Sequence, residues 1–139
     1  MIVFADTSAL YALLVRDDLM HIRDRKCFSY FTEHMVQLLS SSFVLVETIA
    51  LLQRRIGLDA VQDFNARIIP LLEIVWVNAE WYGRAIQRLS SQRKRDISLV
   101  DCLSFEIMEA RTITLAYSYD RHFEENGFTI ASFDKDIQL

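Results

Sequence analysis

The feature of this sequence that most constrains its fold is a set of short apolar runs separated by longer segments with helical periodicity. The clearest runs lie at 2–5, 71–77, 113–117 and 128–130, and they contain several β-branched and aromatic residues. Such runs are typical of strands that are buried on both faces. Strands joined through helices require crossover connections, so the sequence predicts an α/β fold with a parallel sheet covered on both faces.

The segments between these runs predict helices, and local signals mark several of their ends. Gly57 and Pro70 are expected to end two helices. Ser98 and Asp101 have the spacing of a capping box. The three serines at 40–42 predict a break and a possible cap. The expected helices cover about 7–14, 21–39, 43–56, 58–69, 79–91 and the segment from 98 onward, with loops at 15–20 and 92–96.

Composition excludes several classes of protein. Three Gly and one Pro among 139 residues disfavour turn-rich all-β folds, and this length predicts one domain, 1–139. Cys27 and Cys102 are too few for a disulfide scaffold or a four-cysteine zinc site. One disulfide is possible, and two packed thiols in a cytosolic protein are the favoured interpretation. No uncharged stretch reaches 18 residues, so we expect no membrane-spanning helix and a cytoplasmic protein.

The net charge of −4, taken alone, argues against a nucleic-acid-binding protein. The distribution of charge changes this interpretation, because residues 84–95 hold five bases and no acid. Arg93, Lys94 and Arg95 directly precede Asp96 and are the best candidates for contacts to a nucleic-acid backbone. The alternative for each of these basic residues is a solvated surface position.

Four carboxylates occupy positions that suit a shared site. Asp6 ends the first strand and Asp120 follows a later one, and parallel strands bring such ends to one edge of a sheet. Asp101 lies in the first turn of its helix, and Glu47 lies in a strongly apolar segment. Two carboxylates about 4 Å apart repel by roughly 4 kcal/mol at an effective dielectric near 20, so a cluster needs cations. Oxygen ligands suit Mg²⁺ or Mn²⁺, and such sites usually serve phosphodiester hydrolysis.

Each acid also has a purely structural interpretation. Asp6 and Asp120 could cap the helices that follow them, and Asp101 could only complete its capping box. Glu47 could pair with a distant arginine. The three histidines are too scattered in the sequence to predict a histidine-rich metal site, so we expect surface or core roles for His21, His34 and His122.

Four sequence blocks contain these acids. They are Phe4-Ala5-Asp6-Thr7-Ser8-Ala9-Leu10, Val44-Leu45-Val46-Glu47-Thr48, Asp96-Ile97-Ser98-Leu99-Val100-Asp101-Cys102, and Tyr119-Asp120-Arg121-His122-Phe123 followed by Gly127-Phe128. In this order, across nearly the whole chain, they resemble the motifs of the PIN-domain nucleases, and within them the VapC-type toxins. The chain departs from the family's usual pattern at Val100 and in the segment around Ser118, where the family often has a Thr or Ser and a Thr, respectively.

The resemblance implies a three-layer α/β/α sandwich around a parallel sheet and an endoribonuclease that depends on Mg²⁺ or Mn²⁺. It implies that Asp6, Glu47, Asp101 and Asp120 are the catalytic, metal-binding acids, with Asp96 as an outer member. Val100 lacks a hydroxyl that could orient a ligand, and Ser118 is expected to substitute for the missing Thr. VapC-type toxins form dimers and are held by an antitoxin, so an RNA substrate, a homodimer and an antitoxin partner are expected.

A further expectation concerns the apolar residues of two helical segments. The apolar residues of 21–39 and 43–69 could exceed the needs of one core and serve a homodimer or a partner peptide, with simple core packing as the alternative. Asp24 and its basic neighbours are expected on the polar face of the first segment.

The competing functions are a non-catalytic PIN-like module that binds RNA or protein, and a phosphotransfer domain, which is disfavoured because no second Asp lies two residues after Asp6.

Overall fold

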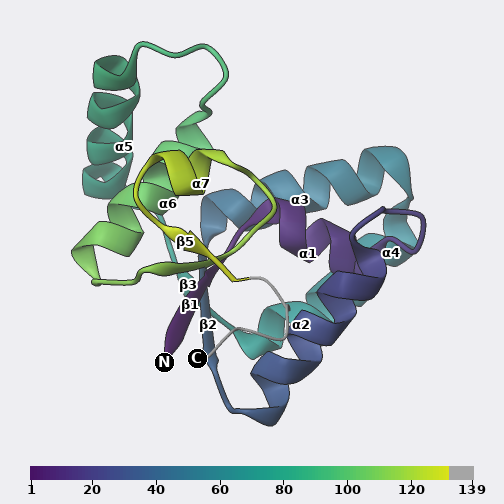
Figure 1. Cartoon of the computed structure of the whole chain (residues 1–139). Coiled ribbons are helices and arrows are strands. Elements are labelled where there is room, and N and C mark those ends of the chain that lie inside the picture. The colour runs from purple at the N-terminus through teal and green to yellow at the C-terminus, as the bar shows by residue number, and fades with distance from the viewer. Residues whose placement is uncertain (132–139) are drawn as a thin grey trace.

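Five parallel strands form the central sheet of this protein (Figure 1), for which we use a computed structural model that describes residues 1–131. The order across the sheet is β3-β2-β1-β4-β5, and every neighbouring pair is parallel. The strands are β1 (Ile2–Ala5), β2 (Gln37–Ser41), β3 (Leu72–Val75), β4 (Leu115–Tyr117) and β5 (Thr129–Ile130). The predicted parallel sheet is therefore confirmed.

Helices cover both faces of the sheet, which confirms the three-layer α/β/α architecture (Figure 1). On one side lie α1 (Thr7–Leu14), α2 (His21–Glu33), α3 (Ser42–Arg55) and α4 (Leu58–Asp63), which leads through a π-turn (Phe64–Ile68) and a 3₁₀-turn (Ile69–Leu71) into β3. On the other side lie α5 (Ala79–Gln92), α6 (Leu99–Ala110) and α7 (His122–Glu125). Within residues 1–131, no helix is long and apolar enough to span a membrane.

The core lies between these layers and is built from the predicted apolar runs. Val3, Phe4 and Ala5 of β1 are fully buried, because β1 is the middle strand and has helices on both faces. The most buried face of α6 packs on the same sheet through residues such as Leu103 and Ile107. Both cysteines are buried free thiols, as expected from the sequence.

The prediction of one helix over 21–39 is wrong, because β2 occupies its C-terminal part. Helix α2 ends at Glu33, and the chain turns at Met35, whose φ of 53° is left-handed. The serines expected to form a break complete β2 and begin the next helix. Ser40 donates a hydrogen bond to the Ala5 carbonyl (2.8 Å), and Ser41 caps α3 by accepting from the Val44 N–H (3.2 Å).

The strand order places a topological switch at β1 and β4. From β1 the chain moves to β2 and β3 on one side, and it then crosses to β4 and β5 on the other. At such a switch the connections leave the two neighbouring strands in opposite directions and open a crevice at their carboxyl ends. Asp6 directly follows β1, and Asp120 lies three residues past β4, so both lie at this crevice.

Candidate active site

A pocket of about 360 Å³ opens at the carboxyl ends of β1 and β4, and all four predicted acids line it. Asp6 comes from the end of β1, Glu47 from α3, Asp101 from α6 and Asp120 from the segment after β4. The structure thus brings together residues that are up to 114 positions apart in the sequence. The fifth predicted acid, Asp96, does not line this pocket among the residues described, and its carboxylate is exposed.

Asp6 is held in place by serine hydroxyls from two segments. Its Oδ2 accepts hydrogen bonds from Ser8 Oγ (2.9 Å) and from Ser118 Oγ (3.0 Å), and more weakly from the Ser8 N–H (3.4 Å). Ser118 Oγ also accepts from the Asp120 N–H (3.0 Å). Ser118 therefore supplies the hydroxyl expected of the family's Thr, and it ties the first acid to the backbone of the last.

The structural interpretations of these aspartates are also observed, and they are compatible with a shared site. Asp6 is the N-cap of α1, and Asp101 forms the predicted capping box with Ser98. Asp120 Oδ1 accepts from the His122 N–H (2.9 Å) at the start of α7. Each of these bonds uses one carboxylate oxygen, Oδ2 in Asp6 and Asp101 and Oδ1 in Asp120. Capping therefore orients each side chain and leaves its second oxygen for a ligand.

The charges of neighbouring acids raise the pKa of Asp101 and of Glu47, which shows that these side chains share one site. Burial, followed by the charges of Asp6, Asp120 and Glu47, raises the pKa of Asp101 to about 7. Burial, followed by the charges of Asp6 and Asp120, also raises the pKa of Glu47. Burial raises the pKa of Asp6, against the opposing effect of its serine hydrogen bonds. A bound cation would relieve this repulsion and restore the ionised forms.

Glu47 is half-buried, which is less burial than its apolar neighbours suggested. Helix α3 turns the apolar residues Val44 and Leu45 into the core and leaves Glu47 at the wall of the pocket. A hydrogen bond from Thr7 lowers the pKa of Glu47 and so favours its ionised form. No salt bridge to Glu47 occurs within residues 1–131, although Arg55, two turns further along α3, lines the same pocket.

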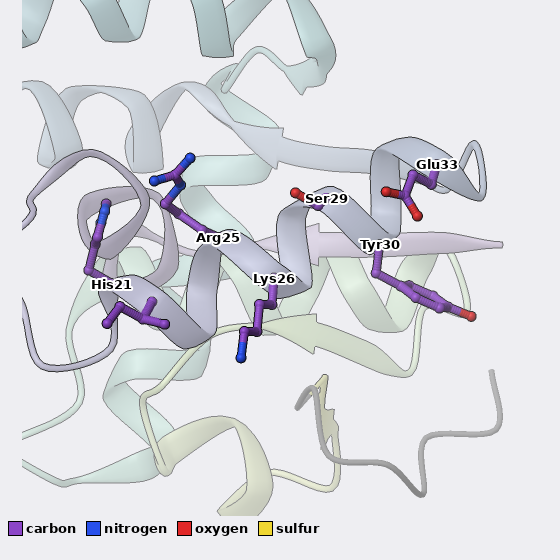
Figure 2. A pocket seen from close by; sticks show the side chains of 7 residues that line it. His21, Arg25, Lys26, Ser29, Tyr30 and Glu33 are labelled. Atoms are coloured by element: carbon purple, nitrogen blue, oxygen red, sulfur yellow. The ribbon is translucent and has the colours of Figure 1, made fainter.

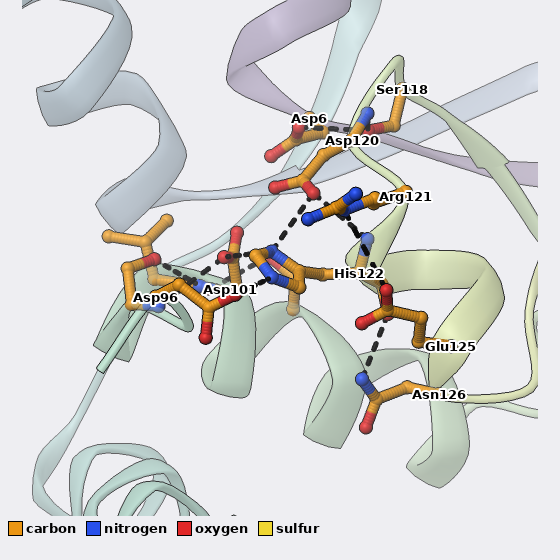
Figure 3. A network of polar contacts seen from close by, with 12 residues as sticks. Asp6, Asp96, Asp101, Ser118, Asp120, Arg121, His122, Glu125 and Asn126 are labelled. Carbon is orange, nitrogen blue, oxygen red and sulfur yellow. Dashed lines mark hydrogen bonds and ion pairs between the residues drawn. The ribbon is translucent and has the colours of Figure 1, made fainter. Parts of the chain in front are cut away.

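His122 is the polar residue of this site that the sequence reasoning missed. Figure 3 shows its ring among Asp96, Asp101 and Asp120. Its Nε2 lies 3.0 Å from Asp96 Oδ2, and its Nδ1 lies 3.0 Å from Asp120 Oδ1 and 3.8 Å from Asp101 Oδ2. The bond with His122 lowers the pKa of Asp96 and raises the pKa of His122. The sequence contained one signal, the position of His122 two residues after Asp120.

Asp24 is a second correction, because it does not lie on the polar face of α2. Its carboxylate is fully buried and accepts hydrogen bonds from the hydroxyls of Tyr117 and Tyr119 (2.9 Å for Tyr119). Burial raises the pKa of Asp24 to about 7. Asp24 does not line the acid pocket, so it belongs to the packing of α2 against the end of β4.

The basic residues of segment 88–95 fall into two groups. Arg93, Lys94 and Arg95 are exposed in the loop between α5 and α6, next to Asp96, and Arg93 has a left-handed φ of 52°. Arg88 is largely buried and pairs with Glu106 (3.2 Å) and Glu109 (3.0 Å), so it joins α5 to α6. The loop residues are therefore accessible to a ligand, whereas Arg88 has a structural role.

A second pocket, of about 470 Å³, runs along the outer face of α2 (Figure 2). Its lining includes two basic side chains, Arg25 and Lys26, and a single carboxylate, Glu33. It does not gather the acids that hydrolytic chemistry on a phosphodiester needs. The acid pocket is therefore the better candidate for the active site.

The donor set of the acid pocket fits a hard divalent cation. Carboxylate oxygens from four separate segments, with space for water between them, match the oxygen ligation of Mg²⁺ and Mn²⁺. One ligand atom each from Asp101, Asp120 and His122 lie within 4.8 Å of one another, which brings these three side chains within reach of one ion.

Comparisons with known proteins agree with this fold. A family model described as "PIN domain" matches residues 3–129. The "23S rRNA-specific endonuclease VapC20" of Mycobacterium tuberculosis, in two strains, is 31% identical over 127 residues, which cover 91% of this chain and 95% of the relative. The crystal structure of M. tuberculosis VapC20, described as a "Sarcin-Ricin loop cleaving toxin", has a TM-score of 0.83 at 30% identity and covers 93% of this chain and 97% of that one.

Two more distant structures share the fold. VapBC2 from Rickettsia felis, bound to a DNA fragment from its promoter, has a TM-score of 0.70 at 16% identity, covering 96% of this chain and 100% of that one. FitAcB from Neisseria gonorrhoeae has a TM-score of 0.65 at 15% identity, covering 94% and 96%. The family model spans most of the chain, and the Mycobacterium relative passes 30% identity over nearly its full length. This chain is therefore a member of the PIN-domain family.

Proposed function

We propose that this protein is a divalent-metal-dependent endoribonuclease and the toxin of a toxin–antitoxin pair. The observation that carries the proposal is the convergence of Asp6, Glu47, Asp101 and Asp120 on one pocket in a PIN-domain chain. The relative with 31% identity is named as an endonuclease, which supports hydrolysis over simple binding. A non-catalytic module is less favoured because it would have no use for four acids gathered in one pocket, where their charges raise the pKa of Asp101 and Glu47.

The acids hold the cation and position the reacting groups. Asp6, Asp101 and Asp120 would bind Mg²⁺ or Mn²⁺, and Glu47 would be a further ligand or would orient the attacking water. A divalent cation in such a pocket lowers the pKa of water and offsets the charge that develops on the phosphate. Ser8 and Ser118 keep the Asp6 carboxylate fixed through their hydrogen bonds, so less reorganisation is needed during the reaction.

The proposed substrate is a structured ribosomal RNA. The Mycobacterium relative is named for 23S rRNA and is described as cleaving the sarcin–ricin loop, so this loop is the first substrate to test. Arg93, Lys94 and Arg95 are exposed beside Asp96, and we assign them contacts to the phosphate backbone. Arg55 of α3 also lines the pocket and would contact a phosphate next to the cleaved bond. Such a substrate places the protein in the cytoplasm.

The proposed partners are an antitoxin protein and a second copy of the chain. A structure of related fold is that of VapBC2 from Rickettsia felis, and the family resemblance implies an antitoxin that holds the toxin. Exposed apolar side chains, Ile22 on α2 and Val46 on α3 among them, give these helices contact surface beyond the core and support a homodimer. The molar mass from light scattering, with and without the product of a neighbouring reading frame, tests both partners.

The function is tested with purified protein and an RNA oligonucleotide that carries the sarcin–ricin loop. We expect cleavage at a defined position with Mg²⁺ or Mn²⁺, and none in EDTA. A matched oligonucleotide with a scrambled loop is the control for substrate choice. Cleavage that continues unchanged in EDTA would overturn the proposed mechanism, and tight RNA binding without cleavage of any RNA would favour the non-catalytic module.

A further inference from the structure

The imidazole of His122 is aimed at the proposed cation site. Figure 3 shows the ring beside Asp101 and Asp120. Its Nδ1 is buried and lies 3.0 Å from Asp120 Oδ1, with which it forms an ion pair when the ring is protonated, and 3.8 Å from Asp101 Oδ2. A buried ring nitrogen that faces two predicted metal-binding carboxylates is placed to share a cation with them.

The opposite edge of the ring is fixed by Asp96. His122 Nε2 lies 3.0 Å from Asp96 Oδ2, and the side chain of His122 is only 12% exposed. In the neutral ring, a carboxylate that accepts the Nε2–H proton leaves the lone pair of the imidazole on Nδ1, which faces Asp120 and Asp101. Metal-binding histidines commonly donate their second N–H to a carboxylate in this way.

From this geometry, and resting on the proposed function, we infer that His122 Nδ1 is a nitrogen ligand of the divalent cation, shared with Asp101 and Asp120 and oriented by Asp96. The three ligand atoms lie within 4.8 Å of one another. Ligand atoms on opposite sides of an ion with bonds of about 2.1 Å lie roughly 4.2 Å apart, so small side-chain adjustments suffice. Asp96 is then a positioning residue, which explains why its exposed carboxylate stands outside the pocket.

A nitrogen ligand changes the preference of the site among divalent cations. Carboxylates and water alone suit Mg²⁺ well, whereas imidazole favours first-row transition ions over Mg²⁺. The site is therefore expected to bind Mn²⁺ more tightly than Mg²⁺, and His122→Asn is expected to reduce this preference. Because a ligating imidazole is neutral, cation binding displaces any proton that Nδ1 carries in the metal-free protein.

The test is pulsed electron paramagnetic resonance of Mn²⁺ bound to the full-length protein. We expect ¹⁴N modulation from a directly bound imidazole in the unmodified protein, and its loss in His122→Asn. His34→Ala is the matched control, because His34 is exposed and stacks on Tyr30 away from the pocket, and it should keep the signal. Asp96→Asn should keep the ¹⁴N signal and weaken Mn²⁺ binding about 10- to 100-fold.

The unmodified protein decides the question even if a variant fails to fold. Mn²⁺ that binds and supports RNA cleavage without ¹⁴N modulation overturns the inference and leaves the proposed function intact. Modulation that persists in a folded His122→Asn protein also overturns it, because another nitrogen is then the ligand. Absence of Mn²⁺ binding and of cleavage overturns both this inference and the proposed function.

Discussion

Two places in this molecule bury carboxylates, and they do so in opposite ways. Asp24 on α2 is fully buried and accepts hydrogen bonds from two tyrosine hydroxyls, Tyr117 and Tyr119. Asp101 in the acid pocket is nearly as buried, and its surroundings include three more acids. The pKa of both is raised to about 7.

The causes of these shifts differ, and this difference separates packing from function. For Asp24 the main cause is burial, and its hydrogen bonds to neutral hydroxyls favour the folded arrangement. For Asp101 the charges of Asp6, Asp120 and Glu47 add to burial, so the folded protein holds mutually repelling groups together. A buried carboxylate that accepts hydrogen bonds from neutral donors has its partners within the fold. A cluster of carboxylates needs a cation to offset the repulsion among its charges.

The largest expected effect is on RNA cleavage, and it distinguishes the acid pocket from the Asp24 network. Asp6→Asn keeps the size of the side chain and an oxygen for Ser8 and Ser118, but it removes a charge from the pocket. We expect RNA cleavage to fall at least about 1,000-fold, because the cation loses a ligand at the reacting phosphate. Asp24→Asn is the matched control and should retain cleavage within a few-fold. Equal losses in both variants would contradict the distinction.

The next largest effect is on the free energy of unfolding, and it also distinguishes the Asp24 network from the acid pocket. Asp24→Ala leaves the buried hydroxyl of Tyr117 and the half-buried hydroxyl of Tyr119 without their acceptor, so the free energy of unfolding should fall by about 2–4 kcal/mol. Tyr117→Phe should lose less, because the carboxylate keeps its bond from Tyr119. Urea denaturation of metal-free protein measures both variants. A fully stable Asp24→Ala protein would show that this network does not contribute to folding.

The pH dependence of stability sharpens the comparison further. A carboxyl whose folded pKa is raised from 3.8 to about 7 stabilises the fold below pH 4, and this stability is lost as the pH rises through 7. Metal-free protein should therefore lose stability between pH 4 and 8. Asp101→Asn should recover on the order of 2 kcal/mol at pH 8, measured by urea denaturation at each pH.

A saturating divalent cation provides the control for this pH dependence. It should flatten the part that arises from the acid pocket and leave the part that arises from Asp24. If the cation left the whole pH dependence unchanged, cation binding would not relieve the repulsion among the four acids.

The smallest effect concerns the basic loop. Neutralising Arg93, Lys94 and Arg95 together with glutamine should raise the KM for RNA several-fold and leave kcat close to its original value. Each lost phosphate contact should reduce the salt dependence of RNA binding by about 0.7 in the log–log slope. Arg67→Gln, in the π-turn after α4, is the matched control, because Arg67 pairs with Asp63 and does not line the acid pocket. Unchanged salt dependence would place the RNA backbone elsewhere.

Much of the site was predictable because its signals are local. The end of the first apolar run places Asp6, the run at 113–117 places Asp120, and the Ser98–Asp101 spacing gives a capping box that the structure contains. Parallel strands then bring the two ends to one edge without further information. These elements depend on hydrophobic periodicity and caps, which a sequence displays directly.

The missed features depend on contacts that are distant in the sequence. Strand β2 is short and ends in serines, and a run of serines in a sequence resembles a break. The bonds of these serines to Ala5 and Val44 form only in the folded protein. Asp24 lies between basic residues and is buried only because Tyr117, at the end of β4, and Tyr119, just after it, meet α2. His122 reaches Asp96 across 26 residues. Local patterns do not reveal such pairings, since they form only when the layers pack.

The central claim is that the acid pocket, and not buried carboxylates in general, binds a divalent cation. Isothermal titration of Mn²⁺ into the unmodified protein, Asp101→Asn and Asp24→Asn tests it most directly. We predict one pocket that binds Mn²⁺ equally well in the unmodified protein and Asp24→Asn, and at least about ten-fold more weakly in Asp101→Asn. Equal Mn²⁺ affinity in all three proteins would contradict the claim.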